Sequence, residues 1–189
     1  MAAGTSTAYK LDLEDMIAFP DAGHVPVFPP NPGESWIIFG EIVKDNSIMR
    51  PVYRVRDKID CQFPVAFYTD NPSEDAKDCK VGHVLCITTA CAMPSRTGRM
   101  GTESRIQAPC TPVFQKTFRA LNQRLREKSD RGEILLCNFC KKPSTQSCAK
   151  CTTRYCSKEC QGVDWKEKGH KKECPVISRL HVWNLTDWG

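Results

Sequence analysis

The chain has 189 residues, with 27 Lys and Arg against 22 Asp and Glu, a formal net charge of +5, and 12 cysteines. This length suits one domain of ordinary size, or one such domain plus a small appendage, and excludes a large multidomain machine. No apolar run approaches the ~18 residues that span a bilayer, and the first residues lack a basic segment followed by an apolar one. We therefore expect an intracellular protein of the nucleus or cytoplasm, where clustered cysteines usually hold metal.

Charge and cysteine content both change near residue 131. Residues 1–130 carry 16 basic and 16 acidic side chains, whereas residues 131–189 carry 11 and 6. Seven cysteines lie between Cys137 and Cys174, and the other five are scattered over residues 61–110. These shifts predict a domain boundary near residue 131.

Residues 1–33 are acidic at first and then rich in proline, with five prolines from Pro20 to Pro32. Proline cannot donate to a strand ladder or continue a helix, so we expect an extended Pro-rich arm.

Residues 34–111 have the pattern of a small β domain. The segments SWIIFGEIV, VYRVRDKI, FPVAFYT and HVLCITTA are rich in β-branched and aromatic residues, and NSIMRP, DNPSEDAKD and PSRTGRMGTES separate or follow them as turn-rich stretches. Alternation in FPVAFYT places Phe63, Val65 and Phe67 on one face. Because so short a sheet would expose its edges if flat, we expect a closed or half-closed barrel. The order and spacing of the predicted strands, of which RIQA at 105–108 is the last, loosely resemble an OB-fold over residues 36–108.

Residues 112–130 are predicted to form an amphipathic basic helix that links this domain to the cysteine cluster. Thr111 suits the N-cap and Pro112 the first helical position, and residues 129–133 end the helix. One apolar stripe runs along it through Phe114, Phe118, Leu121 and Leu125. The cations around this stripe form either a solvated face or a face that binds nucleic acid or a partner protein. They are Lys116, Arg119, Arg124, Arg126 and Lys128.

The region 132–175 contains eight potential metal ligands in four pairs. They read Cys137-x2-Cys140-x7-Cys148-x2-Cys151-x4-Cys156-x3-Cys160-x9-His170-x3-Cys174. Zinc takes four sulfur or nitrogen ligands in a tetrahedron, and two pairs complete one site, so the cluster supplies two zinc sites. Sequential pairing joins the first four ligands and then the last four. Interleaved pairing joins Cys137, Cys140, Cys156 and Cys160, and separately Cys148, Cys151, His170 and Cys174. Spacing alone leaves both open.

The run from Cys137 to Cys174, with TRYCSKECQGVDW and HKKEC inside it, closely resembles a MYND-type zinc finger. All eight ligand positions match, as do Tyr155, Ser157, Gln161, Asp164 and Trp165. The resemblance implies the interleaved, cross-braced arrangement, although the spacing from Cys160 to His170 is longer than is common in the family. RING and PHD fingers place their histidine elsewhere, and HIT-type fingers usually lack the Gln-x2-Asp-Trp run.

A closed site of four protein ligands leaves no position for a reactive water, so both zinc ions are expected to be structural. No phosphate loop, nucleophile elbow or methyltransferase motif is present, so we expect no enzyme. The expected fold class is α+β: a barrel-like N-terminal domain, a helix and a two-zinc finger.

The MYND resemblance also implies a function, because such fingers act as protein-interaction modules and several bind Pro-x-Leu-x-Pro peptides. The matching groove residues are Gln161 and Trp165, one helical turn apart. Trp165 alternatively fills the small core between the zinc ions. Pro26-Val27-Phe28-Pro29-Pro30 has a similar form, which gives the hypothesis that the arm occupies a finger. These features predict an adaptor or regulator.

Weaker signals lie at residues 79–91, in the β domain as a whole and in the C-terminal tail. Cys79, His83, Cys86 and Cys91 are interpreted as core thiols and a packed or surface histidine rather than a third zinc site. The alternative function is single-stranded nucleic-acid binding by the OB-like domain, but residues 34–110 carry ten positive and ten negative side chains. In the tail, residues 176–189, Trp183 and Trp188 either pack against the rest of the chain or await a partner.

Overall fold

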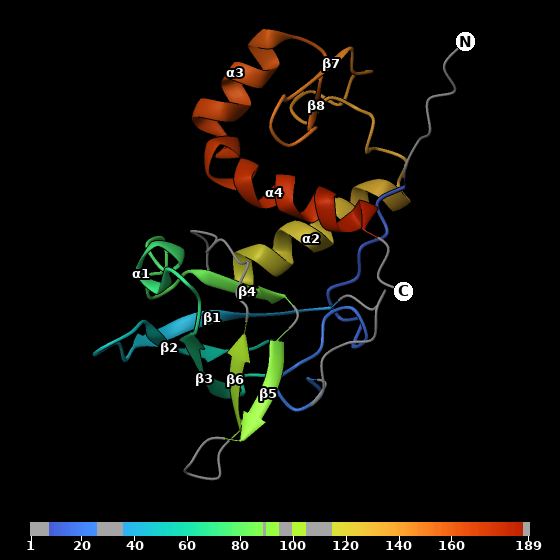
Figure 1. Cartoon of the computed structure of the whole chain (residues 1–189). Helices are drawn as coiled ribbons and strands as arrows, with labels where there is room; N and C mark the ends of the chain where they lie inside the picture. Colours follow the sequence, from blue (N-terminus) through green and yellow to red (C-terminus); the bar gives the residue numbers. More distant parts are fainter. Residues whose placement is uncertain (1–7, 26–35, 89, 95–99, 105–114, 187–189) are drawn as a thin grey trace. The chain divides into compact units, whose positions relative to one another are not determined.

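The computed structural model describes residues 8–25, 36–88, 90–94, 100–104 and 115–186. The chain divides into two compact units. The sheet unit comprises Leu13–Phe118 and Asp187–Gly189, and the finger unit comprises Met1–Asp12 and Arg119–Thr186. Both helix and sheet are present, as the sequence predicts (Figure 1). No helix of the described residues has the length and apolar character needed to cross a membrane.

The sheet unit contains one six-stranded sheet with the order β4-β1-β2-β3-β6-β5. Its elements are β1 (Ile37–Asp45), β2 (Val52–Arg56), β3 (Gln62–Phe67), the short helix α1 (Pro72–Asp75), β4 (Val84–Thr88), β5 (Ala90–Pro94) and β6 (Met100–Ser104). All neighbouring strands are antiparallel except β3 and β6, which are parallel. At Gly40 an added Cβ would lie 2.6 Å from the Arg56 carbonyl oxygen, so glycine permits the close approach of β1 and β2.

The apolar alternation in β3 is confirmed, because Phe63, Val65 and Phe67 are buried while Gln62 and Pro64 are exposed. They join buried residues of β1, β2 and β4 in one core. Strand β6 was not expected, since its sequence MGTES lies in a stretch interpreted as a turn. Its sequence contains one large apolar residue, Met100, and its pairing with β3 and β5 identifies it as a strand.

The expected barrel is not confirmed, because the hydrogen-bonded strand order has two ends, β4 and β5, and is not closed. The sheet is nevertheless strongly curved. Its two end strands are separated by one residue, since β4 ends at Thr88 and β5 begins at Ala90. The chain therefore holds them within about 7 Å at that point, whereas the edges of a flat six-stranded sheet lie about 24 Å apart.

Residues 13–25 form part of the sheet unit and differ from the extended arm that the sequence predicts. Leu13, Phe19 and Val25 are buried, and the Ile37 amide donates to the Ala18 carbonyl oxygen at 2.8 Å. The Lys58 ammonium donates to the carbonyl oxygens of Leu13 and Phe19, at 3.0 and 2.6 Å. The Pro-rich part, with Pro26–Pro30, lies outside the described residues.

Helix α2 (Gln115–Asp130) begins in the sheet unit and continues into the finger unit. Its predicted start at Thr111-Pro112 lies outside the described residues, while Phe118, Leu121 and Leu125 of the predicted stripe are buried. The helix ends where predicted. Gly132 has a φ of 67°, and the Glu133 amide donates back to the Lys128 carbonyl oxygen at 2.7 Å. This is a Schellman ending, and glycine is the residue that adopts its left-handed position without strain.

The finger unit continues through a two-stranded sheet and two helices (Figure 1). Its elements are β7 (Gln146–Ser147), β8 (Arg154–Tyr155), α3 (Lys158–Glu167) and α4 (His170–Leu185). Much of the expected tail is therefore helical, and α4 extends past Pro175 to Leu185. Trp183 is buried in this helix, whereas Trp188 lies outside the described residues.

Residues 8–12, called the strap below, pack within the finger unit although α4 follows them by more than 150 residues in the chain. The Asn184 side-chain oxygen accepts from the amides of Lys10 and Leu11, at 2.7 and 2.9 Å. The Tyr9 hydroxyl donates to the side-chain oxygen of Asn122 at 2.7 Å. Tyr9 and Leu11 are buried, so the strap contributes both apolar area and hydrogen bonds.

We expect Asn184→Ala to destabilise the finger unit by about 1–3 kcal/mol, because two strap amides lose their acceptor. Urea unfolding of the zinc-loaded chain measures this change, and amide hydrogen exchange at Lys10 and Leu11 localises it. Val182→Ala, at an exposed site on the same helix, is the matched control. Equal stability and equal exchange in both variants would show that the strap is not held by Asn184.

Candidate metal centre

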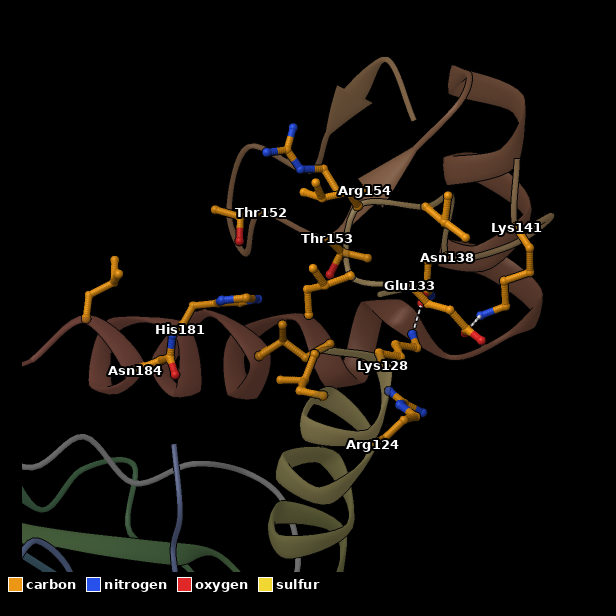
Figure 2. A pocket seen from close by; sticks show the side chains of 16 residues that line it. Arg124, Lys128, Glu133, Asn138, Lys141, Thr152, Thr153, Arg154, His181 and Asn184 are labelled. Atoms are coloured by element: carbon orange, nitrogen blue, oxygen red, sulfur yellow. Dashed lines mark hydrogen bonds and ion pairs between the residues drawn. The ribbon is translucent and has the colours of Figure 1, made fainter. Parts of the chain in front are cut away.

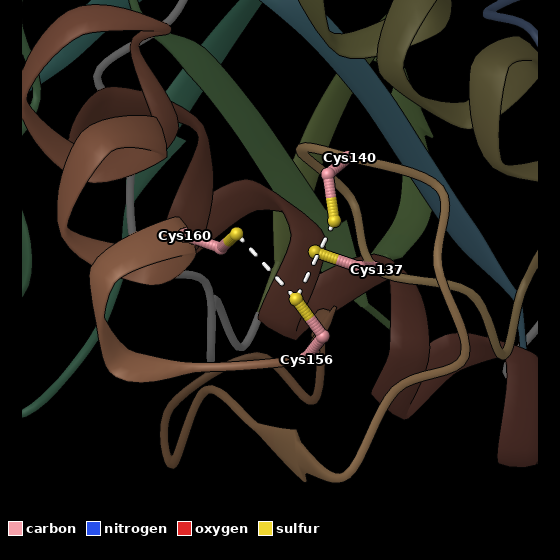
Figure 3. A group of neighbouring side chains, drawn as sticks. All are labelled: Cys137, Cys140, Cys156 and Cys160. Carbon is pink, nitrogen blue, oxygen red and sulfur yellow. Dashed lines mark hydrogen bonds between the residues drawn. The ribbon is translucent and has the colours of Figure 1, made fainter.

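The eight predicted ligands come together as two groups of four. Each group places its donor atoms within 4.8 Å of one another. The first group, shown in Figure 3, consists of Cys137, Cys140, Cys156 and Cys160. The second consists of Cys148, Cys151, His170 and Cys174, all of them buried. Of the two pairings that the spacing left open, the interleaved one is the arrangement found.

The distances between donors fit zinc tetrahedra. With Zn–S bonds of about 2.3 Å, two sulfurs lie about 3.8 Å apart, and a sulfur and a nitrogen about 3.5 Å apart. The Sγ atoms of Cys148 and Cys174 are 3.8 Å apart, and Cys151 Sγ is 3.5 Å from His170 Nε2. In the first group Cys156 Sγ lies 3.4 Å from Cys140 Sγ and 3.5 Å from Cys160 Sγ. These separations exceed a disulfide bond of about 2.05 Å, and all seven cysteines are thiols.

The two Cys-x2-Cys segments have the same backbone geometry. The Cys137 amide donates to Lys142 O and the Lys141 amide to Cys137 O, at 2.8 and 3.0 Å. In the second segment the Cys148 amide donates to Thr153 O and the Thr152 amide to Cys148 O, also at 2.8 and 3.0 Å. In both segments the residue after the second cysteine has a positive φ, 63° at Lys141 and 62° at Thr152. This turn directs both cysteines of a pair toward one point.

Backbone amides favour the thiolate of the first cysteine in each segment. Burial alone would raise the pKa of Cys137, but the amides of Cys140, Cys156 and Phe139 hydrogen-bond to its sulfur and lower the pKa to about 6. Because zinc binds the thiolate, these amides prepare a ligand for the metal.

Burial opposes ionisation of Cys148 in the same way. Hydrogen bonds from the His170 side chain and from the amides of Lys150 and Cys151 outweigh it and lower the pKa of Cys148 to about 6. Each site therefore contains one cysteine whose thiolate is stabilised by the fold itself.

The remaining ligands are positioned by helix starts. Ser157 caps α3, and its hydroxyl oxygen accepts from the Cys160 amide at 3.3 Å. Gly169, with a φ of 88°, precedes the first residue of α4, so the long spacing before His170 is absorbed by a glycine turn. His170 and Cys174 then lie one turn apart on the same face of α4.

A buried carboxylate, that of Asp164, joins three segments of the finger. Its Oδ2 accepts from the Tyr155 hydroxyl at 2.6 Å and from Asn138 Nδ2 at 2.7 Å. Burial and the Asp164 carboxylate raise the pKa of Tyr155, so the phenol keeps the proton that it donates. Asn138 was not singled out in the sequence, because nothing in the spacing of the cysteines indicates its contact with α3.

The predicted peptide-binding residues lie on α3. Gln161 and Trp165 are both partly exposed and one helical turn apart. The Trp165 ring also packs edge-on against His170, with 5.7 Å between ring centroids. Trp165 therefore contacts a metal ligand and still presents part of its surface to solvent.

The other histidine and cysteine pattern, at 79–91, forms no third group among the described residues. Cys79 and Cys86 are buried, and His83 Nδ1 lies 2.9 Å from the Asp78 carbonyl oxygen. The side chain of Cys91 lies outside the described part of the chain.

Two comparisons with known proteins concern this region. Residues 137–174 match the family model described as the MYND finger. A segment of 47 residues is 49% identical to ubiquitin carboxyl-terminal hydrolase 19 of Arabidopsis thaliana. That segment is 24% of this chain and only 6% of the relative. Residues 137–174 are thus a MYND finger, a non-catalytic, zinc-binding module of protein interaction, and its two groups of donors fit two structural zinc ions.

Paired serine substitutions test which ligands share an ion. We expect Cys140→Ser with Cys156→Ser to leave one zinc per chain, because both residues belong to the first group. Cys140→Ser with Cys148→Ser should leave none. Elemental analysis after dialysis measures the zinc content, with Cys61→Ser, an exposed thiol outside both groups, as the control that retains two. Sequential pairing would give the opposite result for the two double variants.

Substitution of Asp164 tests the buried carboxylate. We expect Asp164→Ala to destabilise the zinc-loaded finger by about 2–5 kcal/mol, because two interior donors lose their acceptor. Thermal unfolding measures the change, and Glu167→Ala, an exposed carboxylate at the end of α3, provides the comparison. If the two variants unfold at the same temperature, the hydrogen bonds of Asp164 contribute nothing to stability.

Proposed function

We propose that the chain is an adaptor or regulator whose finger binds proline-rich, Pro-x-Leu-x-Pro-like segments of other proteins through Gln161 and Trp165. The partly exposed Trp165 ring is the observation that carries this proposal. An aromatic surface beside an amide is the usual means of recognising such peptides, since a polyproline segment loses little entropy on docking.

The position of Gln161 supports the same proposal. Its side chain lies one turn before Trp165 on α3, and the side-chain amide makes no hydrogen bond to any described residue. An amide so placed can bond to the main chain of an extended peptide while the peptide's apolar side chain covers the indole. The arm segment Pro26–Pro30 is a second proposed occupant of this face, in this chain or in another copy.

Alternative nucleic-acid binding by residues 34–111 stays a prediction. A groove that follows phosphates needs an excess of cations, and residues 34–110 carry equal numbers of both charges. The finger is therefore the better-supported binding site.

We expect Trp165→Ala to weaken binding of a labelled Pro-x-Leu-x-Pro peptide at least tenfold, and Gln161→Ala about fivefold, because an aromatic contact and a hydrogen bond are lost. Fluorescence anisotropy measures the affinity, and zinc content is determined on the same samples. Lys166→Ala, at an exposed site on α3, is the control.

The zinc content separates the two interpretations of Trp165. Lost peptide binding with two zinc ions retained supports a groove. Loss of zinc together with binding would instead show that the indole is a core residue covering His170. A peptide that binds wild type and Trp165→Ala equally would refute the proposed site.

A further inference from the structure

A basic pocket lies within the finger unit and has no part in the metal centre or in the proposed peptide face. It has a volume of about 240 Å³ and is bordered by the second half of α2, residues between 133 and 141, residues 152–154 and α4. Figure 2 shows polar side chains from these segments around one hollow. No residue of α3 lines it.

The lining is strongly asymmetric in charge. It contains one carboxylate, Glu133, and four cations drawn from three segments: Arg124, Lys128, Lys141 and Arg154. Glu133 pairs with Lys141 at 3.6 Å, and Arg124 pairs with Glu173 of α4. Arg154 makes no ion pair with any described residue. Two lining cations thus have no carboxylate partner within the described part of the chain.

Lys128 is the second of these cations, and its partner is uncharged. Its ammonium donates to the side-chain oxygen of Asn138. Burial, and then the neighbouring charges of Lys141 and Arg124, lower the pKa of Lys128 to about 8. The carboxylates of Asp164 and Glu173 act in the opposite direction but do not cancel this effect. Lys128 is thus a partly buried cation without a carboxylate partner among the described residues, and an anion beside it would stabilise its charge.

Apolar walls accompany the cations. Leu135 and Leu185 line the pocket and are 47% and 69% exposed, while Ile177 and Leu125 line it from buried positions. Large apolar side chains that stay this exposed around a pocket commonly mark a binding surface. The walls contain no Phe, Tyr or Trp ring on which a nucleobase would stack.

We propose that this pocket binds an acidic peptide segment of a partner protein, with a leucine-like side chain against Leu135 and Leu185 and carboxylates beside Lys128 and Arg154. Charge complementarity selects the acidic residues, and the apolar walls favour a peptide over a nucleic acid. The site is separate from the one on α3, so the finger offers two peptide-binding surfaces of different chemistry.

The test uses the zinc-loaded full chain and a fluorescein-labelled decapeptide of Glu and Asp around a central Leu-Leu pair. Arg154→Glu should weaken its binding about tenfold or more, because it replaces an attraction by a repulsion. Lys166→Glu makes the same change of charge on α3 and should alter the affinity less than about twofold. Fluorescence anisotropy at fixed salt measures both.

A second pair of variants tests the apolar wall. Leu185→Ser should weaken binding about threefold to tenfold, while Val182→Ser, 60% exposed on the same helix but outside the pocket, should leave it unchanged. The same peptide with Lys in place of every acidic residue should not bind.

Three results would overturn the proposal. The first is that the acidic peptide fails to bind at the highest soluble protein concentration. The second is that Arg154→Glu and Lys166→Glu weaken peptide binding equally. The third is that a single-stranded oligonucleotide binds more tightly than the peptide and loses affinity with Arg154→Glu. Binding of the proline-rich peptide is measured alongside, and we expect Arg154→Glu to leave it unchanged. The two proposed binding sites are therefore tested independently of each other.

Discussion

The convergence of eight donor atoms on two points constrains the finger more than an apolar core does. Between Cys137 and Cys174 the buried side chains are metal ligands, Tyr155 and Asp164. In the sequence, Cys148 and Cys151 of the second group lie between the two pairs of the first group, and Cys156 and Cys160 of the first group lie between the two pairs of the second. Neither site is therefore complete until nearly the whole finger is ordered. A structural zinc ion contributes about 10–16 kcal/mol of apparent binding free energy, which replaces the missing hydrophobic burial.

The metal constraint extends into α4 and from there to the rest of the unit. His170 and Cys174 fix the first turn of this helix, and the following turns bury Val176, Ile177 and Leu180. The last turn then presents Asn184 to the strap and Leu185 to the basic pocket. One helix thus connects zinc coordination to the strap and to the basic pocket.

The features predicted correctly are those encoded over short distances in the sequence. The ligand pairs, the buried side of β3 and the glycine ending of α2 depend on spacings of one to five residues. The strap depends on contacts between residues 113 to 176 positions apart, and Asn138 contacts Asp164 across 26 positions. The pocket combines residues from four segments between 124 and 185. Hydrophobic periodicity does not indicate contacts of these kinds. Strand β6 was missed for a related reason, because its polar sequence becomes a strand only through its neighbours. The tail is expected to begin at residue 176, yet α4 continues through Pro175 to Leu185, and the apolar residues that follow Pro175 are buried.

The strap also has a consequence for how the protein is made. Lys10 leaves the ribosome 174 residues before Asn184, its hydrogen-bond partner. At usual rates of synthesis this interval lasts about 10–30 s, long enough for the intervening sheet unit to fold first. Throughout that time Tyr9 and Leu11 have no finger to pack against, and they stay accessible to chaperones. The strap can therefore take its place in the finger unit only after α4 has been synthesised.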